Sequence, residues 1–247
     1  MFQSRCKIPF HPENIGGTYH QASPLEGTLT LSSLQTDRPE ATAGLVSCLV
    51  TAFSSGVWEQ TPMPVGDPDD PGSALGVINS LSPAPVVLAA YKHSSPVYIE
   101  EVVGCVLGAI LDHTMIEMYG LEPYAAVPGD GLLAFIGIVP SAQGLRVLPD
   151  GSDSIRITGT TPVGGTISLA RHLFEKWIHT PRIQSCPRVF IRTREQIAPV
   201  IHLCESLGFE YCGRFELDFC EMRQERLVFR LSDPRRLPQA RPAQGPN

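Results

Sequence analysis

Apolar positions recur along the chain with two different spacings, and these spacings divide it into predicted strands and helices. Apolar residues that alternate with polar ones, or that form a short run, predict strands, whereas apolar residues three or four positions apart predict helices. The predicted strands are 29–34, 85–92, 99–111, 132–139, 188–192, 209–219 and 226–231. The predicted helices are 39–53, 74–81, 166–179 and 195–207. This order predicts a mixed α/β fold, in which helices flank a central mixed sheet of about seven strands.

Two segments carry especially clear patterns. Residues 132–139 read LLAFIGIV and are apolar throughout, which is typical of a strand in the middle of a sheet. In residues 166–179, apolar side chains such as Leu173 and Trp177 form one stripe on a helix. Gly208 follows the last predicted helix and provides its C-terminal stop. With 247 residues, the chain has the length of one large domain with appendages.

The domain boundaries follow from the distribution of proline and glycine. Residues 1–26 have little periodicity and are predicted to be an N-terminal arm. Residues 27–232 form the predicted domain, and residues 233–247 form a C-terminal tail without a core. Residues 112–131 form a long connection between two strands, and we expect it to act as a lid over a site, since long loops are often functional.

A β-hairpin is predicted near residues 145–158, which read LRVLPDGSDSIRIT. Both flanks alternate apolar and polar residues, and the central PDGSD is a strong turn signal. Because a hairpin returns the chain to its starting point, we expect Gly144 and Gly159 to lie close together. The helix that begins after Gly164-Gly165-Thr166 would then start near Gly144.

Composition narrows the class of protein. A net charge of −6 and a pI of about 5.6 argue against a nucleic-acid partner, which usually meets a basic face. The seven cysteines include no C-x-x-C pair, and the histidines are scattered, so neither a metal site nor a disulfide framework is expected. Free thiols favour a reducing, cytoplasmic location. No apolar run reaches membrane-spanning length and no secretory signal is apparent, so we expect no membrane partner.

Two short motifs resemble those of the GNAT superfamily of N-acetyltransferases. Ile138-Val139-Pro140, followed by Gln143-Gly144, is similar to the end of the family's fourth strand and the start of its anion-binding loop. The phrase 204–209, CESLGF, is similar to the end of a helix that runs into a strand in this family. The order of the predicted elements also agrees from about residue 25 to 231. The resemblance implies a GNAT-like acyl-CoA N-acyltransferase fold with a hairpin inserted into the loop.

The resemblance also implies an activity. An acetyl group would pass from acetyl-CoA to a primary amine of a small molecule or peptide, by direct attack of the amine. The alternative is a catalytically silent CoA-binding protein that acts as a sensor or interaction module. Either protein would be a monomer or a homodimer.

Binding of acetyl-CoA is assigned through the same resemblance. The pantetheine arm would pair with the backbone of Ile136 and Ile138, as an added strand does. The pyrophosphate would bind at a helix N-terminus, where backbone N–H groups and the helix dipole attract anions. Gln143 and Gly144 would form one side of this loop, and Gly164, Gly165 and Thr166 the other. The alternative interpretation is an ordinary core strand and a flexible linker into the helix.

The catalytic groups are less clearly marked. Cys204 stands where the family often has a tyrosine that protonates the departing thiolate, but it also fits as a small residue on the buried side of its helix. Tyr211 is a substitute donor or a plain strand residue. The candidates for the base are Asp130, His113 and Glu59, and each also fits as a solvated loop residue.

Overall fold

The computed structural model describes residues 28–33, 39–54, 65, 67–81, 85–94, 99–148, 154–161, 164–219 and 222–237. The predicted arm 1–26, Glu59 and residues 238–247 of the predicted tail lie outside this set. The first residues of that tail belong to the core, because Leu237 is buried and the carbonyl oxygen of Pro234 accepts a hydrogen bond from Gln184. The predicted tail therefore includes core residues as far as Leu237.

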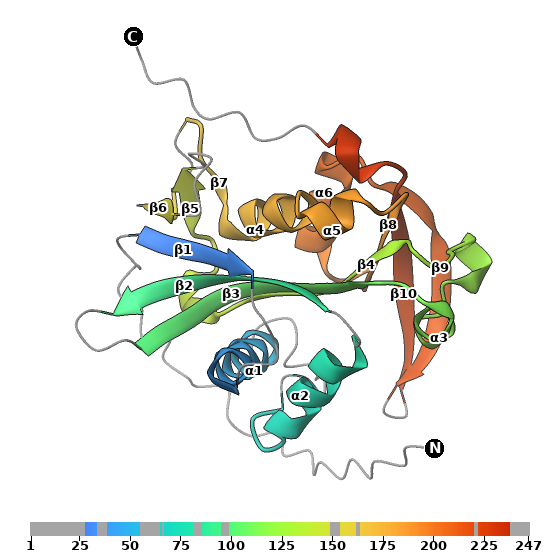
Figure 1. Ribbon diagram of the computed structural model, residues 1–247, viewed down its shortest axis with the longest axis horizontal. Helices are drawn as coiled ribbons and strands as arrows, with labels where there is room; N and C mark the ends of the chain where they lie inside the picture. The colour runs from blue at the N-terminus through green and yellow to red at the C-terminus, as the bar shows by residue number, and fades with distance from the viewer. Residues whose placement is uncertain are drawn as a thin grey trace.

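The described strands form one mixed sheet of ten strands in the order β7-β5-β6-β1-β2-β3-β4-β8-β10-β9 (Figure 1). The strands are β1 (Thr28–Ser33), β2 (Val86–Ser94), β3 (Ile99–Ile110), β4 (Gly131–Ile138), β5 (Arg146–Leu148), β6 (Ser154–Gly159), β7 (Ile167–Ser168), β8 (Val189–Thr193), β9 (Glu210–Phe219) and β10 (Met222–Leu231). Seven of them match the predicted strands. The other three come from the predicted hairpin and from Ile167–Ser168, so the mixed sheet is confirmed and is larger than expected.

Helices cover both faces of the sheet. The helices are α1 (Pro39–Phe53), α2 (Pro71–Ser80), α3 (His113–Met118), α4 (Leu169–Ile178), α5 (Pro181–Gln184) and α6 (Ala198–Ser206). Figure 1 shows α1 and α2 on one face, and α4, α5 and α6 on the other. The described part of the chain contains no helix with the length and apolar character needed to cross a membrane.

Two predicted segments differ from the structure. The helix expected from residue 166 begins at Leu169, because Ile167 and Ser168 pair with β5 and the Ser168 side chain accepts a hydrogen bond from the Arg171 N–H. The connection 112–131 contains α3, whose first turn is capped by Asp112 through the Met115 N–H at 2.8 Å. Met115 and Ile116 are buried, so this segment contributes its own apolar residues to the hydrophobic core.

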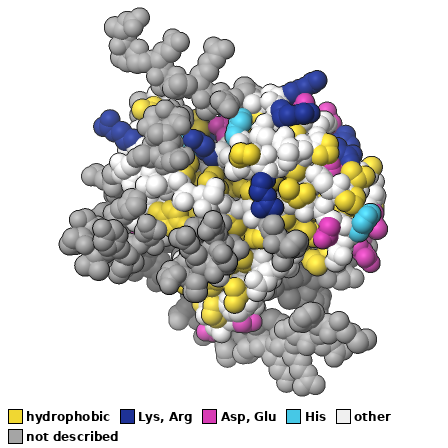
Figure 2. Space-filling model, in the orientation of Figure 1, with side chains coloured by type: hydrophobic (Ala, Val, Ile, Leu, Met, Phe, Trp, Pro, Cys, Tyr) yellow, Lys and Arg dark blue, Asp and Glu magenta, His cyan; other side chains and the backbone are white. Residues whose placement is uncertain are grey.

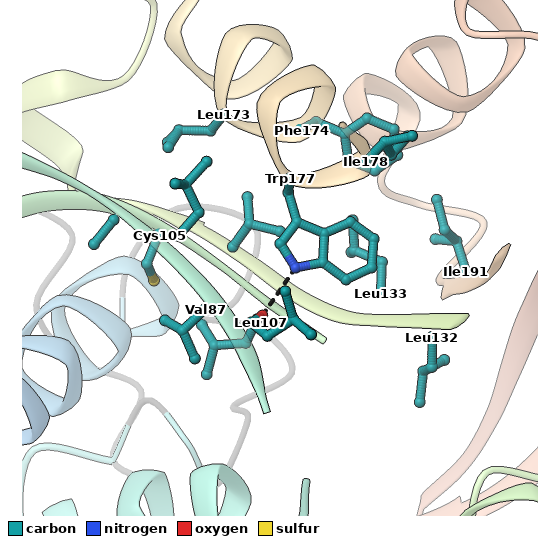
Figure 3. Close-up of a cluster of buried hydrophobic side chains, with 14 of the residues drawn as sticks. Val87, Cys105, Leu107, Leu132, Leu133, Leu173, Phe174, Trp177, Ile178 and Ile191 are labelled. Carbon is teal, nitrogen blue, oxygen red and sulfur yellow. Dashed lines mark hydrogen bonds between the residues drawn. The ribbon is translucent and has the colours of Figure 1, made fainter. Parts of the chain in front are cut away.

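The core between α4 and the sheet is centred on Trp177 (Figure 3). This side chain is fully buried, and its indole N–H donates to the carbonyl oxygen of Val86 at 2.8 Å. Around the ring, Leu173 and Ile178 of α4 face Leu107 and Leu132 of the sheet. The hydrogen bond satisfies the one polar group of a large apolar side chain, so α4 is fixed over the middle of the sheet.

Candidate active site

Strands β4 and β8 separate from each other partway along β4. They pair in parallel only from Gly131, opposite Val189, to Leu133, opposite Ile191. On its other side, β4 pairs with β3 as far as Ile138. Within the described part of the chain, the backbone of residues 134–138 therefore has no strand beside it on the β8 side.

A β-bulge lies at the point of separation. In the ladder between β3 and β4, Leu107 faces Phe135. The next residue of β3, Gly108, faces Leu133, which leaves Ala134 as the additional residue. A bulge bends its strand and increases the local twist. Because this bend directly follows the last residue of β4 that pairs with β8, it explains why the strands part here.

A pocket of about 270 Å³ opens at this separation. Its apolar wall includes Phe53 of α1 and Phe135 of β4, whose rings meet edge to face with centroids 5.9 Å apart. Its polar wall comes from the end of α3, from β8 and the residue after it, and from β10. The polar lining residues are Tyr119, Arg192, Thr193, Arg194 and Arg226. The site is thus largely apolar, with its polar groups gathered on one side.

Arg192 is held in place by Tyr119. Its guanidinium donates a hydrogen bond to the Tyr119 carbonyl oxygen at 2.6 Å and lies 4.5 Å from the centroid of the Tyr119 ring. It also lies 5.3 Å from the ring centroid of Phe215. Burial lowers the pKa of Arg192 to about 10, opposed by Tyr119, so the guanidinium keeps its charge at neutral pH.

Tyr119 lines the pocket and carries a phenolic hydroxyl. Burial raises the pKa of this hydroxyl, against the opposing effects of a hydrogen bond with Ser80 and the charge of Arg192. The group is therefore protonated at neutral pH.

The loop after β4 meets the start of α4. The Leu169 N–H donates to the Leu145 carbonyl oxygen at 2.9 Å, which places Gly144 beside the first turn of α4. The Gln143 side chain turns back and donates to the Ile138 carbonyl oxygen at 3.3 Å. The predicted hairpin is present as well, and Gly159 pairs with Arg146, two residues after Gly144.

The second half of the predicted loop lies elsewhere. Strands β5 and β7 are antiparallel, with Arg146 opposite Ser168 and Val147 opposite Ile167. Gly165 and Gly164 therefore lie toward the Leu148 end of β5, away from Gly144. Thr166 is buried, and its carbonyl oxygen accepts a hydrogen bond from Arg146 at 2.6 Å. The residues beside Gly144 are Ser168, Leu169 and Ala170.

Comparison with known proteins supports the fold. No family model matches the chain, and no curated protein matches it. A chain of the NatC complex bound to Gag peptide and CoA aligns with a TM-score of 0.52 and 14% identity, over 84% of this chain and 99% of that one. An acetyltransferase of the GNAT family from Streptococcus pneumoniae aligns with a TM-score of 0.50 and 15% identity, over 82% and 98%. The chain has the GNAT acetyltransferase fold.

Within this GNAT fold, the two predicted proton donors lie outside the pocket wall. Cys204 is completely buried on α6, and burial raises the pKa of its thiol to about 12. Tyr211, on β9, is 52% exposed and packs against Phe229 with ring centroids 5.7 Å apart. Neither residue lines the pocket, so their catalytic roles stay predictions.

Two of the three predicted bases, Asp130 and His113, also lie outside the pocket wall. Asp130 is fully buried just before β4, where its carboxylate accepts hydrogen bonds from Arg188 at 2.7 and 3.1 Å and from the Val127 N–H at 2.9 Å. This set of partners gives Asp130 a structural role. His113 is exposed at the start of α3, and neither residue lines the pocket. Glu59 lies outside the described residues.

The arginines are the polar pocket residues that sequence reasoning missed, whereas Tyr119 belongs to the connection 112–131 that was expected to cover the site. Arg192 and Arg194 stand in the stretch IRTRE at the end of a buried strand, where charged residues alternate with apolar and small ones. That alternation was a usable signal, since a strand places alternate residues on one face. Ile136 lines the pocket as a residue of β4, whereas Ile138 lies beyond it, beside Gly104 of β3.

Proposed function

We propose that this chain is an acetyl-CoA-dependent N-acetyltransferase that acts on a primary amine of a small molecule or peptide. The observation that carries the proposal is the separation of β4 from β8 at the Ala134 bulge, which opens into a largely apolar pocket. An extended acyl-pantetheine arm fits such a gap, because the backbone of residues 134–138 offers hydrogen-bonding groups without a neighbouring strand on one side.

The proposed position of the cofactor follows the course of β4. The pyrophosphate would bind beside Gly144, at the first turn of α4, where the helix dipole favours an anion. Arg171 lies in that turn and is partly exposed, although its guanidinium also contacts Glu175 at 2.7 Å. The arm would then extend along β4 toward Ala134 and bring the thioester into the pocket.

In the reaction, the amine nitrogen attacks the thioester carbonyl carbon, an amide bond forms, the C–S bond breaks, and the sulfur leaves as a thiolate. The amine loses one proton and the thiolate gains one. No aspartate, glutamate or histidine occurs among the described residues that line the pocket, so we propose that the amine loses its proton to water. Tyr119 is the proposed donor to the thiolate, because its hydroxyl is protonated and the residue lines the pocket.

The absence of a carboxylate or imidazole from the described pocket wall is also what favours the second candidate, a silent CoA-binding protein. The two functions differ in one observable. An enzyme releases free CoA thiol when acetyl-CoA and an amine are both present, whereas a silent protein binds acetyl-CoA without releasing thiol.

The proposal is tested by calorimetric titration with acetyl-CoA and by a thiol-release assay with a panel of amines. We expect saturable binding and amine-dependent thiol release. Ala134→Phe fills the gap at the bulge and should weaken acetyl-CoA binding at least tenfold. Ala43→Phe, an equal change at an exposed site on α1, should leave binding unchanged. Absence of acetyl-CoA binding to the unaltered protein would refute both candidate functions.

A further inference from the structure

Three arginine side chains meet at the polar wall of the pocket, from two neighbouring strands. Arg192 lies in β8 and Arg194 directly follows it, so the two side chains leave the chain on the same face. On β10, Leu227 pairs with Thr193, and Arg226 precedes Leu227. Arg226 thus occupies the next position of the antiparallel ladder, opposite Arg194.

The arginines form a local concentration of positive charge in an acidic protein. Arg194 and Arg226 are only 5% and 8% exposed, and the described pocket wall contains no acidic residue. Figure 2 shows basic side chains elsewhere on the drawn face as separate groups. Burial, together with the charges of Arg194 and Arg192, lowers the pKa of Arg226 to about 10. Arginine is the most basic side chain, so these guanidinium groups are cations at neutral pH.

Arg194 and Arg226 place two buried cations at facing positions of one ladder, in the wall of the pocket. Like charges at such positions repel each other, and an anionic ligand bound between them relieves this repulsion. Two guanidinium groups on one wall suit an oxyanion, because each offers paired N–H donors that match carboxylate or phosphate oxygens.

We infer that the acceptor amine carries an oxyanion, a carboxylate or a phosphate, which binds at Arg194 and Arg226 while the amine faces the thioester at Ala134. Arg192, fixed by Tyr119, adds positive potential beside this subsite. The inference rests on the proposed function, since it concerns the acceptor of the same site. The positive potential would also lower the pKa of the bound amine and so favour its reactive, neutral form.

The position and size of the pocket assign the oxyanion to the acceptor. No residue from 143 to 171 lines the pocket, so the arginines are separate from the start of α4, where the cofactor phosphates are proposed to bind. A volume of about 270 Å³ is slightly below the range of typical ligand sites, which begins at about 300 Å³. The acceptor is therefore a small amine or the first residue of a peptide.

The experiment compares acceptors that differ only in the anion. Thiol release is measured with β-alanine against propylamine, and with phosphoethanolamine against ethanolamine, for the unaltered protein and for Arg194→Gln, Arg226→Gln and Arg226→Lys. Arg156→Gln, at an exposed site on β6, is the matched control. Calorimetry with acetyl-CoA and thermal melting are recorded for every variant, to separate acceptor effects from cofactor binding and folding.

We expect the anionic acceptors to have at least tenfold higher kcat/KM than their partners. This preference should fall at least tenfold in both glutamine variants, persist in part in Arg226→Lys, and remain in Arg156→Gln, with acetyl-CoA affinity unchanged. A larger preference for β-alanine over propylamine identifies the oxyanion as a carboxylate. A larger preference for phosphoethanolamine over ethanolamine identifies it as a phosphate. Equal rates with charged and neutral amines would overturn the inference and leave the proposed function intact. Loss of acetyl-CoA binding in the unaltered protein, or no transfer to any of the four amines, would overturn both.

Discussion

Gly108 on β3 and Trp177 on α4 fit each other so closely that a side chain at Gly108 would overlap the indole ring. A Cβ atom there would also overlap the carbonyl oxygen of Leu132. The indole meanwhile donates to the Val86 carbonyl oxygen, so it is not free to move aside. Gly108 faces Leu133 in the ladder, directly beside the bulge at Ala134. The same close contact therefore fixes α4 over the β3–β4 ladder, beside the bulge where β4 leaves β8 and the pocket opens.

Gly108→Ala should lower the free energy of unfolding by about 3 kcal/mol, because overpacking at a rigid site displaces either the indole or the backbone. Chemical denaturation measures this loss. The double variant Gly108→Ala, Trp177→Leu should remain destabilised, since the Leu132 carbonyl oxygen still blocks the added methyl group. Gly76→Ala, in the exposed middle of α2 with open space around it, should stabilise by up to about 1 kcal/mol. A neutral Gly108→Ala would contradict the packing described for Trp177.

Gly144→Glu should weaken acetyl-CoA binding at least tenfold, because it places a negative charge beside the first turn of α4. Gly165→Glu tests the loop predicted from sequence, and the antiparallel pairing of β5 and β7 predicts a much smaller effect there. Both glycines have positive φ, so Gly129→Glu, also at positive φ, controls for backbone strain. Calorimetric titration compares all three. Equal losses at Gly144 and Gly165 would restore the predicted split loop.

Tyr119→Phe should lower kcat roughly 10²-fold, since it removes the proposed proton donor and keeps the ring under Arg192. The affinity for acetyl-CoA should stay the same. Cys204→Ala should keep kcat within about twofold and lower stability by roughly 1 kcal/mol, the cost of removing one small buried group. Thiol-release kinetics and denaturation measure both variants. If only Cys204→Ala lost kcat strongly, Cys204 would be the proton donor, as the sequence motif predicts.

The buried thiols predict a loss of stability at alkaline pH. Burial raises the pKa of Cys204 to about 12 and that of Cys186 to about 11, from 9.0. Above pH 9 the unfolded chain releases these protons while the folded chain retains them, so the stabilisation present below pH 9 is lost as pH rises toward 11 and 12. Each thiol contributes a slope of at most about 1.4 kcal/mol per pH unit. Denaturation between pH 8.5 and 10.5 measures the slope, and Cys204→Ala should reduce it. An identical slope in that variant would count against the proposed titration.

Much of the fold follows from local sequence patterns. The apolar run 132–139 is β4, and the alternation around residues 149–153 marks a hairpin because each flank already has strand periodicity. The start of α4 was misplaced because Ile167 and Ser168 pair with β5, a tertiary contact that overrides the local preference for helix. The short α3 was also missed, although Asp112 with Met115 and Ile116 carries the signal of a capped helix.

The pocket was harder to predict than the fold because it depends on pairings between distant residues. The bulge at Ala134 is defined only by its register against β3. Arg226 meets Arg194 only because β10 lies beside β8, with β9 on the outside of the sheet. The sequence motif placed a donor at Cys204, but the neighbouring turn of α6 presents Val200 to the pocket and leaves the thiol inside the core.

The hairpin inserted after Gly144 also determines which edge strands of the sheet have unpaired backbone groups that another chain can pair with. Outermost strands expose unpaired N–H and C=O groups that can template pairing between copies. Because β6 covers β1, and β5 and β7 follow, the described sheet ends on that side in a two-residue strand, Ile167–Ser168. The opposite margin is β9, with ten residues. Intermolecular strand addition, where it occurs, is therefore directed to the β9 margin.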